Sequence, residues 1–177
     1  MAFDSARGRL VMYGGIDASD KWDQDVWEWD RERWHCIPTG TGPGDRAHHA
    51  MAYDSGRGRV VCRGGTRQDK SHPLDTWEWD GRTWRQAAAG GPGPGNGYRM
   101  AYDAERGVTV LFGGDTCLWD GASWTRVTTP RAPVSRSVHA IAYDPVRQRV
   151  VLHGGSLGQE RAADTWEWDG AAWTEMI

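Results

Sequence analysis

Residues 64–80, GGTRQDKSHPLDTWEWD, decide the fold because closely related stretches recur along the whole chain. Double glycines begin at four places, Gly14, Gly64, Gly113 and Gly154, separated by 50, 49 and 41 residues. The aspartates that end "AFD" or "AYD" keep the same spacing: Asp4, Asp54, Asp103 and Asp144. Four copies of one unit therefore fill the 177 residues, and this periodicity predicts a repeat architecture.

Each copy has the sequence character of four short strands. In the second copy these are HHAMAYD, RVVCRGG, DTWEWD and TWRQA, which are aromatic or β-branched and separated by turn residues. The first and last connections, DSGRGR and DGRT, are tight. The middle connection has nine residues in copies one and two and eight in copy four, but it is missing from GGDTCLWD, residues 113–120 of copy three.

Antiparallel four-stranded units repeating at about 50 residues predict a β-propeller, in which each unit is a blade. The pattern resembles the kelch repeat, with an apolar strand ending in a double glycine, then a strand with aromatics and Asp, then a Trp early in the last strand. The resemblance covers essentially the whole chain. It implies an all-β, kelch-type β-propeller with four blades of four antiparallel strands, forming one domain over 1–177 with blades near 1–38, 46–88, 95–128 and 136–177.

Composition narrows the classes of partner. The 21 basic and 24 acidic residues are spread along the chain and give a net charge of −3, without the basic stripe that nucleic acid requires. No apolar run approaches the roughly 20 residues that span a bilayer, and the first residues do not read as a signal peptide. We therefore expect no nucleic-acid or membrane partner, a cytoplasmic location, and reduced thiols at the three cysteines.

Positions that are alike in every copy are interpreted as scaffold. Eleven of the twelve tryptophans fall on repeat positions and are predicted to form the core. An Asp-x-x-Arg turn recurs in all copies and predicts a turn closed by an ion pair: Asp4 with Arg7, Asp54 with Arg57, Asp103 with Arg106, Asp144 with Arg147.

One pair of positions changes together. Second strands carry Arg and third strands carry Glu in three copies, whereas copy three has two apolar residues there: Arg9 with Glu28, Arg59 with Glu78, Arg149 with Glu167, and Val108 with Leu118. We expect a cross-strand or near-diagonal Arg–Glu pair in three blades, replaced as a unit in the third. Copy three is then a coordinated variant whose missing loop leaves a notch.

Function is expected at the end of the propeller that carries the long connections, because loops on a rigid scaffold can vary without cost to the fold. Divergent polar and aromatic residues gather at two repeat positions near this end. The candidates for ligand binding are Arg63, Phe112, His153, Tyr13, His48 and Trp22. The candidates for catalysis are His49, His139, Tyr98 and Arg99, of which His49 and His139 are also weak candidates for a metal.

Each of these residues has a structural alternative. A His at the start of an inner strand serves packing more often than ligation, and Trp22, the only tryptophan off the repeat register, can pack on the rim. The kelch family includes enzymes of the galactose oxidase type, but the copper ligands of that type, two tyrosines with one crosslinked to cysteine, are not matched here. No cofactor is identified.

The resemblance and the loop pattern favour a small kelch propeller of bacterial type that acts as a binding module for a protein, peptide or small polar molecule. An enzyme, metal-dependent or acid–base, with its site at the funnel mouth is the alternative. A further alternative is a half-ring that pairs with a second chain into eight blades. A monomer is modestly favoured over the homodimer.

Overall fold

The computed structural model describes residues 1–93 and 97–176. All the secondary-structure elements in these residues are β-strands. The chain divides into two compact units, Met1–Asn96 and Gly97–Ile177. Each unit contains two four-stranded antiparallel sheets, here called blades 1 and 2 in the first unit and blades 3 and 4 in the second. The predicted all-β fold of four antiparallel sheets is confirmed for the described residues, and none of them lies in a helix that could cross a membrane. Residues 95 and 177, predicted as blade limits, lie outside the described part.

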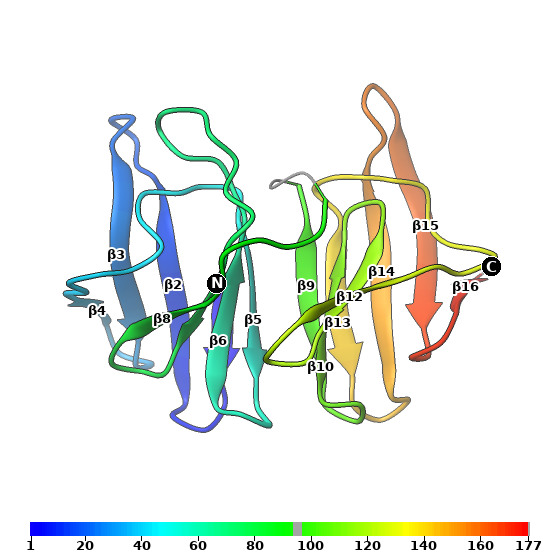
Figure 1. Cartoon of the computed structure of the whole chain (residues 1–177), viewed down its shortest axis with the longest axis horizontal. Helices are drawn as coiled ribbons and strands as arrows, with labels where there is room; N and C mark the ends of the chain where they lie inside the picture. The colour runs from blue at the N-terminus through cyan, green and yellow to red at the C-terminus, as the bar shows by residue number, and fades with distance from the viewer. Residues whose placement is uncertain (94–96, 177) are drawn as a thin grey trace. The chain divides into compact units, whose positions relative to one another are not determined.

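The first unit is built from eight strands, all joined to their neighbours in sequence (Figure 1). Blade 1 consists of β1 (Ala2–Asp4), β2 (Arg9–Ile16), β3 (Trp22–Trp29) and β4 (Trp34–Ile37). Blade 2 consists of β5 (Ala50–Asp54), β6 (Arg59–Arg63), β7 (Thr76–Trp79) and β8 (Trp84–Ala88).

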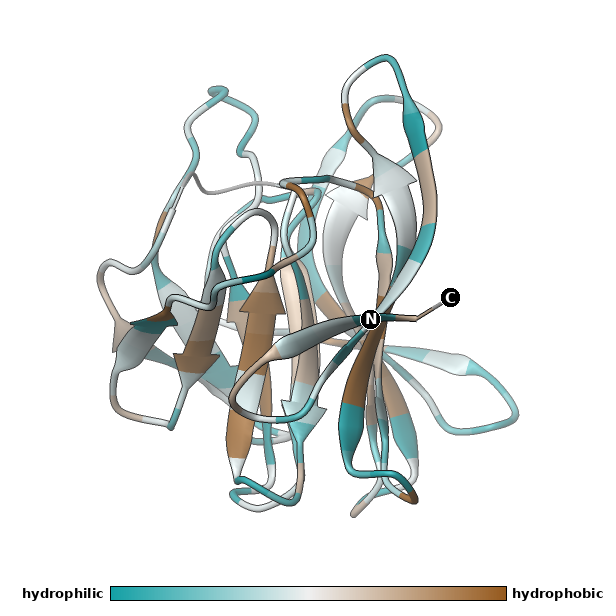
Figure 2. Cartoon of the chain, turned by 90° about the vertical axis from the view of Figure 1, so that its right-hand side faces the viewer, coloured by the Kyte–Doolittle hydropathy of each residue, from teal (hydrophilic) through white to brown (hydrophobic). Residues whose placement is uncertain are grey.

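The second unit repeats this order. Blade 3 consists of β9 (Arg99–Asp103), β10 (Val108–Phe112), β11 (Thr116–Trp119) and β12 (Trp124–Val127). Blade 4 consists of β13 (Ala140–Asp144), β14 (Arg149–Ser156), β15 (Arg161–Trp168) and β16 (Trp173–Met176). The hydrophobic residues lie mainly on strands and the connecting loops are largely hydrophilic (Figure 2).

Each blade has two chemically different faces because side chains alternate along a strand. One face, here called the tryptophan face, carries a row that crosses all four strands, such as Tyr53, Val60, Trp79 and Trp84 in blade 2. The other face, here called the valine face, carries small and β-branched residues, such as Ala2, Val11 and Val26 in blade 1.

Within each unit, the tryptophan face of one blade packs on the valine face of the other. Blade 2 presents Val60, Trp79 and Trp84 to blade 1, and blade 4 presents Val150, Trp168 and Trp173 to blade 3. Trp79 and Trp168 are 1% and 0% exposed. Burial of a tryptophan removes roughly 150 to 250 Å² from water, which makes these faces the dominant apolar contacts of each unit. The tryptophans of these two faces are core residues, as the repeat register predicts, but the prediction is wrong for Trp34, the blade 1 equivalent of Trp84, which is 39% exposed.

Polar contacts across the faces differ between the two units. In the first unit the Trp79 Nε1 donates to Glu28 Oε1 at 3.3 Å, and in the second the Trp173 Nε1 donates to Thr116 Oγ1 at 2.8 Å. Leu118 replaces the glutamate in blade 3, and the Trp168 Nε1 is buried without an acceptor among the described residues. The coupled change in blade 3 therefore affects the contact between blades.

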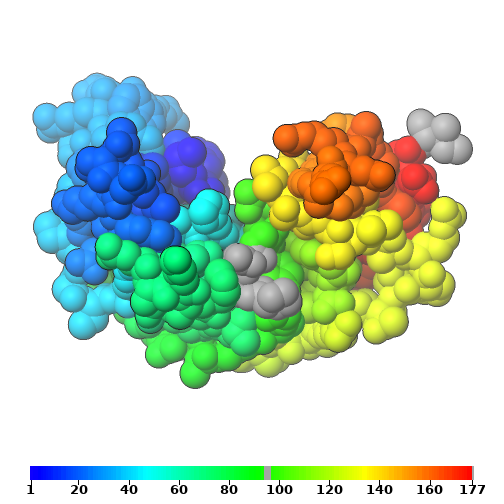
Figure 3. All heavy atoms as spheres, turned by 90° about the horizontal axis from the view of Figure 1, so that it is seen from above, coloured from blue at the N-terminus to red at the C-terminus, as the bar shows by residue number. Residues whose placement is uncertain are grey.

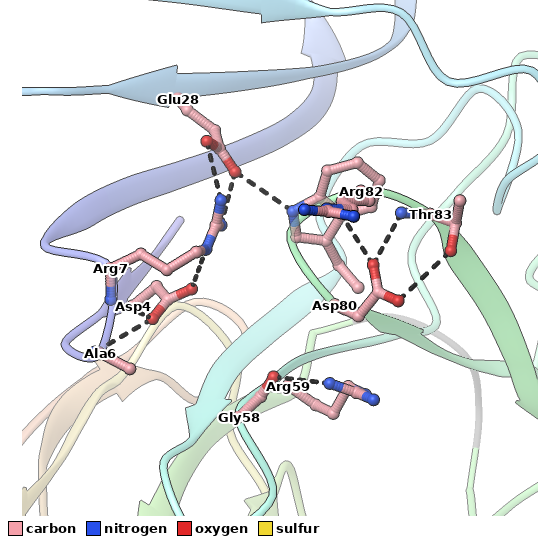
Figure 4. A network of polar contacts seen from close by, with 10 residues as sticks. Asp4, Ala6, Arg7, Glu28, Gly58, Arg59, Asp80, Arg82 and Thr83 are labelled. Carbon is pink, nitrogen blue, oxygen red and sulfur yellow. Dashed lines mark hydrogen bonds and ion pairs between the residues drawn. The ribbon is translucent and has the colours of Figure 1, made fainter.

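The predicted Asp-x-x-Arg turns are confirmed in all four blades. In blade 1 the Asp4 carboxylate accepts from the Ala6 and Arg7 amides at 3.1 Å and from the Arg7 Nε at 2.7 Å (Figure 4). Each of the other three blades has an ion pair at the equivalent positions.

The predicted pairing of second-strand arginines with third-strand glutamates is wrong, although the arginine and glutamate positions do lie on the same face of the blade. Glu28 pairs with Arg7 of the turn at 2.6 Å, while Arg9 lies 3.3 Å from Asp30. In blade 2 the Arg59 guanidinium donates to the Gly58 carbonyl (Figure 4). The turn arginine reaches the glutamate because it extends along the valine face, whereas the strand arginine turns toward the tight-turn end. Glu78 and Glu167 likewise pair with turn arginines, Arg57 and Arg147.

The middle connections are shorter than the sequence predicts in two blades. In blades 1 and 4 the second and third strands continue past the double glycine through a bulge, between Tyr13 and Gly15 and between His153 and Gly155. The loops shrink to residues 17–21 and 157–160. In blade 3 Phe112 pairs directly with Thr116, so the predicted short hairpin is present.

The residue six positions before each "AYD" aspartate adopts a left-handed backbone. Gly97 has φ +82° in blade 3, but His48 and the β-branched Val138 have φ +58° and +57°. A left-handed L-residue costs roughly 1–2 kcal/mol, and β-branched residues rarely adopt this conformation.

Replacing Val138 with glycine is therefore expected to raise the free energy of unfolding by about 0.5–1 kcal/mol, since relief of strain exceeds the entropy that glycine adds to the unfolded chain. Denaturant unfolding would measure this. The matched control is Val134→Gly, at another exposed valine outside the left-handed region, which should be neutral or destabilising. Equal destabilisation by both changes would contradict the assignment.

Glu28→Leu is expected to lower the free energy of unfolding by about 1–3 kcal/mol, because the Arg7 guanidinium and the Trp79 indole both lose an acceptor in a largely buried place. Glu32→Leu, on the exposed β3–β4 turn, is the control and should change stability little. Thermal or denaturant unfolding of the two variants tests this, and equal effects would refute the role of Glu28.

Candidate functional site

The long connections of each unit share one end. In each unit taken by itself, the second-to-third-strand hairpins and the segment between its two blades lie opposite the tight turns (Figure 1), and Figure 3 shows the hairpin loops from above. We call it the long-loop end. It is the end at which the sequence places the candidate site.

Blade 3 has a hollow of about 150 Å³ beside its shortened hairpin. The hairpin contributes one wall, and the segment that leaves β12 contributes the other. Its lining consists of Gly114, Asp115, Thr116, Arg126, Val127, Thr128, Thr129 and Ala132. The missing loop therefore coincides with a real depression in the surface of the second unit, lined mostly by polar groups.

Blade 1 has a hollow at the equivalent place in the first unit. It measures about 300 Å³ and lies between the β2–β3 hairpin and the segment after β4, lined by Tyr13, Gln24, Thr39, Gly40, Thr41, Gly42 and Gly44. A neighbouring hollow of about 360 Å³ lies on the other side of that segment and includes Arg82 and Thr83 of the β7–β8 turn. Threonine hydroxyls and glycine backbone groups dominate the walls of the first of these two hollows, which suits it to hydrogen bonding with a polar partner.

Charge distinguishes the blade 3 hollow from that of blade 1. Asp115 and Arg126 form an ion pair at 2.6 Å on its wall, and their side chains are 34% and 65% exposed. An exposed pair of this kind is only weakly stabilising, so both groups can exchange their partner for a ligand at little cost. The wall offers a carboxylate and a guanidinium side by side.

A buried arginine shapes the long-loop end in blades 2 and 4. The Arg46 guanidinium donates to the Gly64 carbonyl at 3.1 Å and to Asp75 at 3.0 Å, and Arg136 contacts Gly154 and Asp164 in the same way. Burial by itself raises the pKa of Asp75, but the hydrogen bonds from Arg46 and Trp77 outweigh it and hold this pKa below its usual value. These contacts connect the segment before β5, and likewise the segment before β13, to the double glycine of the same blade.

Blade 3 lacks this tie because glycine stands at position 95, which lies outside the described residues. Asp115 is equivalent to Asp75 and Asp164, and in this blade it pairs with Arg126 instead. The arginine tie was missed at the sequence level. Its signal was present, since Arg46 and Arg136 both stand eight residues before a repeated aspartate.

Three predicted binding residues are buried packing residues. Tyr13 is 2% exposed, donates its hydroxyl to the Gly44 carbonyl at 2.7 Å, and has a pKa raised by burial. Phe112 is fully buried against His139 and Trp173. Arg63 is 1% exposed and donates to the Pro92 carbonyl. Of the three, Tyr13 lines one of the hollows described above, and Phe112 and Arg63 line none of them.

The other predicted binding residues are more accessible. His153 is exposed, and its Nδ1 lies 2.9 Å from Thr165 Oγ1 on the valine face of blade 4. His48 is exposed at the left-handed position. Trp22 is half-buried as the first residue of β3, opposite Ile16, so it lies on a strand and not in the loop between β2 and β3, which ends at Lys21. None of these three lines the hollows described above.

The predicted catalytic residues divide between the units. His49 lies in the first unit, where its ring packs edge-on against Tyr13 at 5.8 Å. Tyr98, Arg99 and His139 lie in the second, with Tyr98 and His139 buried and Arg99 half-buried. The Tyr98 ring covers Gly113, where a Cβ atom would come within 2.3 Å of it. Tyr98 therefore supports the short hairpin from within.

Burial, followed by the charges of Arg99 and Arg136, lowers the pKa of His139 to about 4. Its imidazole is therefore neutral at neutral pH and 3% exposed, a state suited to packing against Phe112. In residues 1–93 and 97–176, no three His, Cys, Asp or Glu side chains gather as a metal site would require. His49 and His139 thus have no such cluster around them.

The strands, faces and loop ends together define a propeller-like all-β protein. Neither the family models nor the curated proteins match the sequence. Among solved structures, that of YjhT resembles the chain with a TM-score of 0.73 and 13% sequence identity, covering 95% of this chain and 67% of YjhT. At this identity the similarity supports the fold.

Acid should weaken the tie between Arg136 and Asp164. Hydrogen bonds from Arg136 lower the pKa of Asp164 to about 2 from 3.8, so the stabilisation is complete above about pH 4 and is lost as the pH falls toward 2. Asp164→Asn should lower the free energy of unfolding by about 1–2 kcal/mol at neutral pH, and this difference should shrink between pH 4 and pH 2.

Glu160→Gln, on the same exposed hairpin, is the control for loss of a carboxylate. Unfolding measured across this pH range tests the tie. A difference between Asp164→Asn and the parent that stays constant from pH 7 to pH 2 would contradict it.

Proposed function

We propose that this chain is a binding module of the kelch-type propeller class and that it recognises a protein or peptide segment at the long-loop end. The observation that carries the proposal is the hollow beside the shortened hairpin of blade 3, with its exposed Asp115–Arg126 pair. The four-fold repeat supports the kelch assignment, and the all-β propeller-like fold is compatible with a binding role.

The size of the blade 3 hollow favours a macromolecular partner over a free small molecule. Sites that enclose small ligands usually have volumes of roughly 300–1,000 Å³. The two hollows next to blade 1, of about 300 and 360 Å³, reach the lower end of this range, whereas the blade 3 hollow, at about 150 Å³, falls below it. A depression of this size accepts one or two side chains of a peptide, while the surrounding loops contact the rest.

The chemistry of the walls indicates what the segment carries. Thr128 and Thr129 offer hydroxyls, and Asp115 and Arg126 offer both signs of charge. Paired opposite charges match a peptide with its own neighbouring charges, because each exchanges one ion pair for another. A polar or charged segment is therefore the proposed ligand.

Selection of random heptapeptides displayed on phage against the immobilised chain, followed by affinity measurements, tests the proposal. Ala132→Trp fills the blade 3 hollow and is expected to weaken the selected peptides at least tenfold. Ala122→Trp, on the exposed β11–β12 turn at the other end of the same blade, is the matched control and should change affinity less than twofold.

Peptides that lose affinity with Thr41→Trp and not with Ala132→Trp would place the site in the blade 1 hollow at the same end. Peptides weakened by Ala122→Trp alone, or by none of the three changes, would refute the proposal.

A further inference from the structure

The tryptophan face of blade 1 is exposed where the equivalent faces are buried. Its row consists of Phe3, Leu10, Trp29 and Trp34, in register with the rows that blades 2 and 4 bury in their units. Trp34 is 39% exposed, whereas its equivalents Trp84 and Trp173 are 7% and 3% exposed. Phe3 is 54% exposed. Blade 1 therefore exposes an aromatic surface that, in blades 2 and 4, packs against the valine face of the neighbouring blade.

The valine face of blade 4 is exposed in a complementary way. Ala140 and Ala142 are exposed and Val151 is half-buried, while their blade 1 equivalents Ala2 and Val11 are 8% and 0% exposed. Small side chains on this face leave room for tryptophans, as they do within each unit. One chain thus carries both halves of the contact that joins its own blades.

Hydrogen-bonding groups on the two faces also match. Glu28 and Thr116 accept from indoles of the neighbouring blade, and blade 4 has Glu167 and Thr165 at the equivalent positions. Each inter-blade interface within a unit contains one of these two bonds. A junction between blade 4 and blade 1 supplies both acceptors, facing the positions of Trp29 and Trp34.

We propose that two copies of this chain associate head to tail, with the valine face of blade 4 of one copy on the tryptophan face of blade 1 of the other. The occupant we assign is a second copy; because neither face is complementary to itself, the contact joins unlike faces and is heterologous, whereas closure within one chain would leave a 19.7 kDa species. Burial of Phe3 and Trp34 drives the association, and the indole bonds fix its register.

One position in this junction is mismatched. The turn arginines Arg7 and Arg106 lie against Gly81 and Gly170 of the neighbouring blade, where a Cβ atom would come within 2.8 Å and 1.8 Å of them. Blade 1 carries Arg31 at the equivalent position, so Arg147 of the second copy would meet an arginine. Arg147 has a 52% exposed side chain and can move aside, which weakens the junction without blocking it.

Light scattering of the full chain after size-exclusion chromatography tests the proposal. We expect a mass of at least 39.4 kDa, twice the 19.7 kDa of one chain, at micromolar concentration. Phe3→Glu and Ala142→Glu should each give a 19.7 kDa species. Gln68→Glu, on the exposed β6–β7 loop of blade 2, which takes no part in the junction, is the control and should keep the parent mass.

Mixing the two disrupted variants distinguishes the head-to-tail contact of blade 4 with blade 1 from a contact between two like faces. Phe3→Glu retains an intact blade 4 and Ala142→Glu an intact blade 1, so the mixture should form a heterodimer of 39.4 kDa although neither variant does so alone. Recovery of the complex also shows that both variants are folded. A 19.7 kDa parent protein, or a complex that Phe3→Glu abolishes and Ala142→Glu does not, would overturn the proposal.

Arg31→Gly provides a test in the opposite direction. It removes the mismatched side chain and also relieves a left-handed φ of +85°. The dissociation constant should fall at least threefold, and a weaker association would count against the proposed register.

Discussion

The packing of a tryptophan face on a valine face is the constraint on which the rest of each unit depends. A single four-stranded sheet of this size cannot bury its aromatic side by itself, so each blade needs a neighbour. Trp79 and Trp168 are the centres of these contacts, and both are almost completely buried. The tight turns and their Asp–Arg pairs keep the strands in register so that the faces can meet.

The same constraint separates structural residues from functional ones. Tyr13, Phe112 and His139 diverge among the copies, yet they pack beneath the long-loop end and adjust the fit between blades. The blade 3 hollow is lined by none of them, and the blade 1 hollow by Tyr13 alone; both hollows lie between a hairpin and the segment that leaves the outermost strand. Divergence at a repeat position thus has two physical causes, local repacking and ligand contact, and burial distinguishes them.

The repeat made the sheets predictable because strand periodicity, turn residues and tryptophan register all point to the same units. The partner of Glu28 was not predictable from spacing, since Arg7 reaches it from the turn across space. The continuation of strands through the double glycine in blades 1 and 4 depends on bulges that sequence does not specify. The notch at residues 113–120 was predicted correctly as a short hairpin, whereas the wall formed by Arg126 to Ala132 depends on the course of a loop.

Exchange of the indole hydrogens, followed by NMR, is the measurement that tests the central claim most directly. If tryptophan faces pack on valine faces within each unit, the Nε1 hydrogens of Trp79, Trp168 and Trp173 should exchange orders of magnitude more slowly than that of a free indole. Exchange of these three at the rate of a free indole would show that the faces do not pack, and would contradict the account.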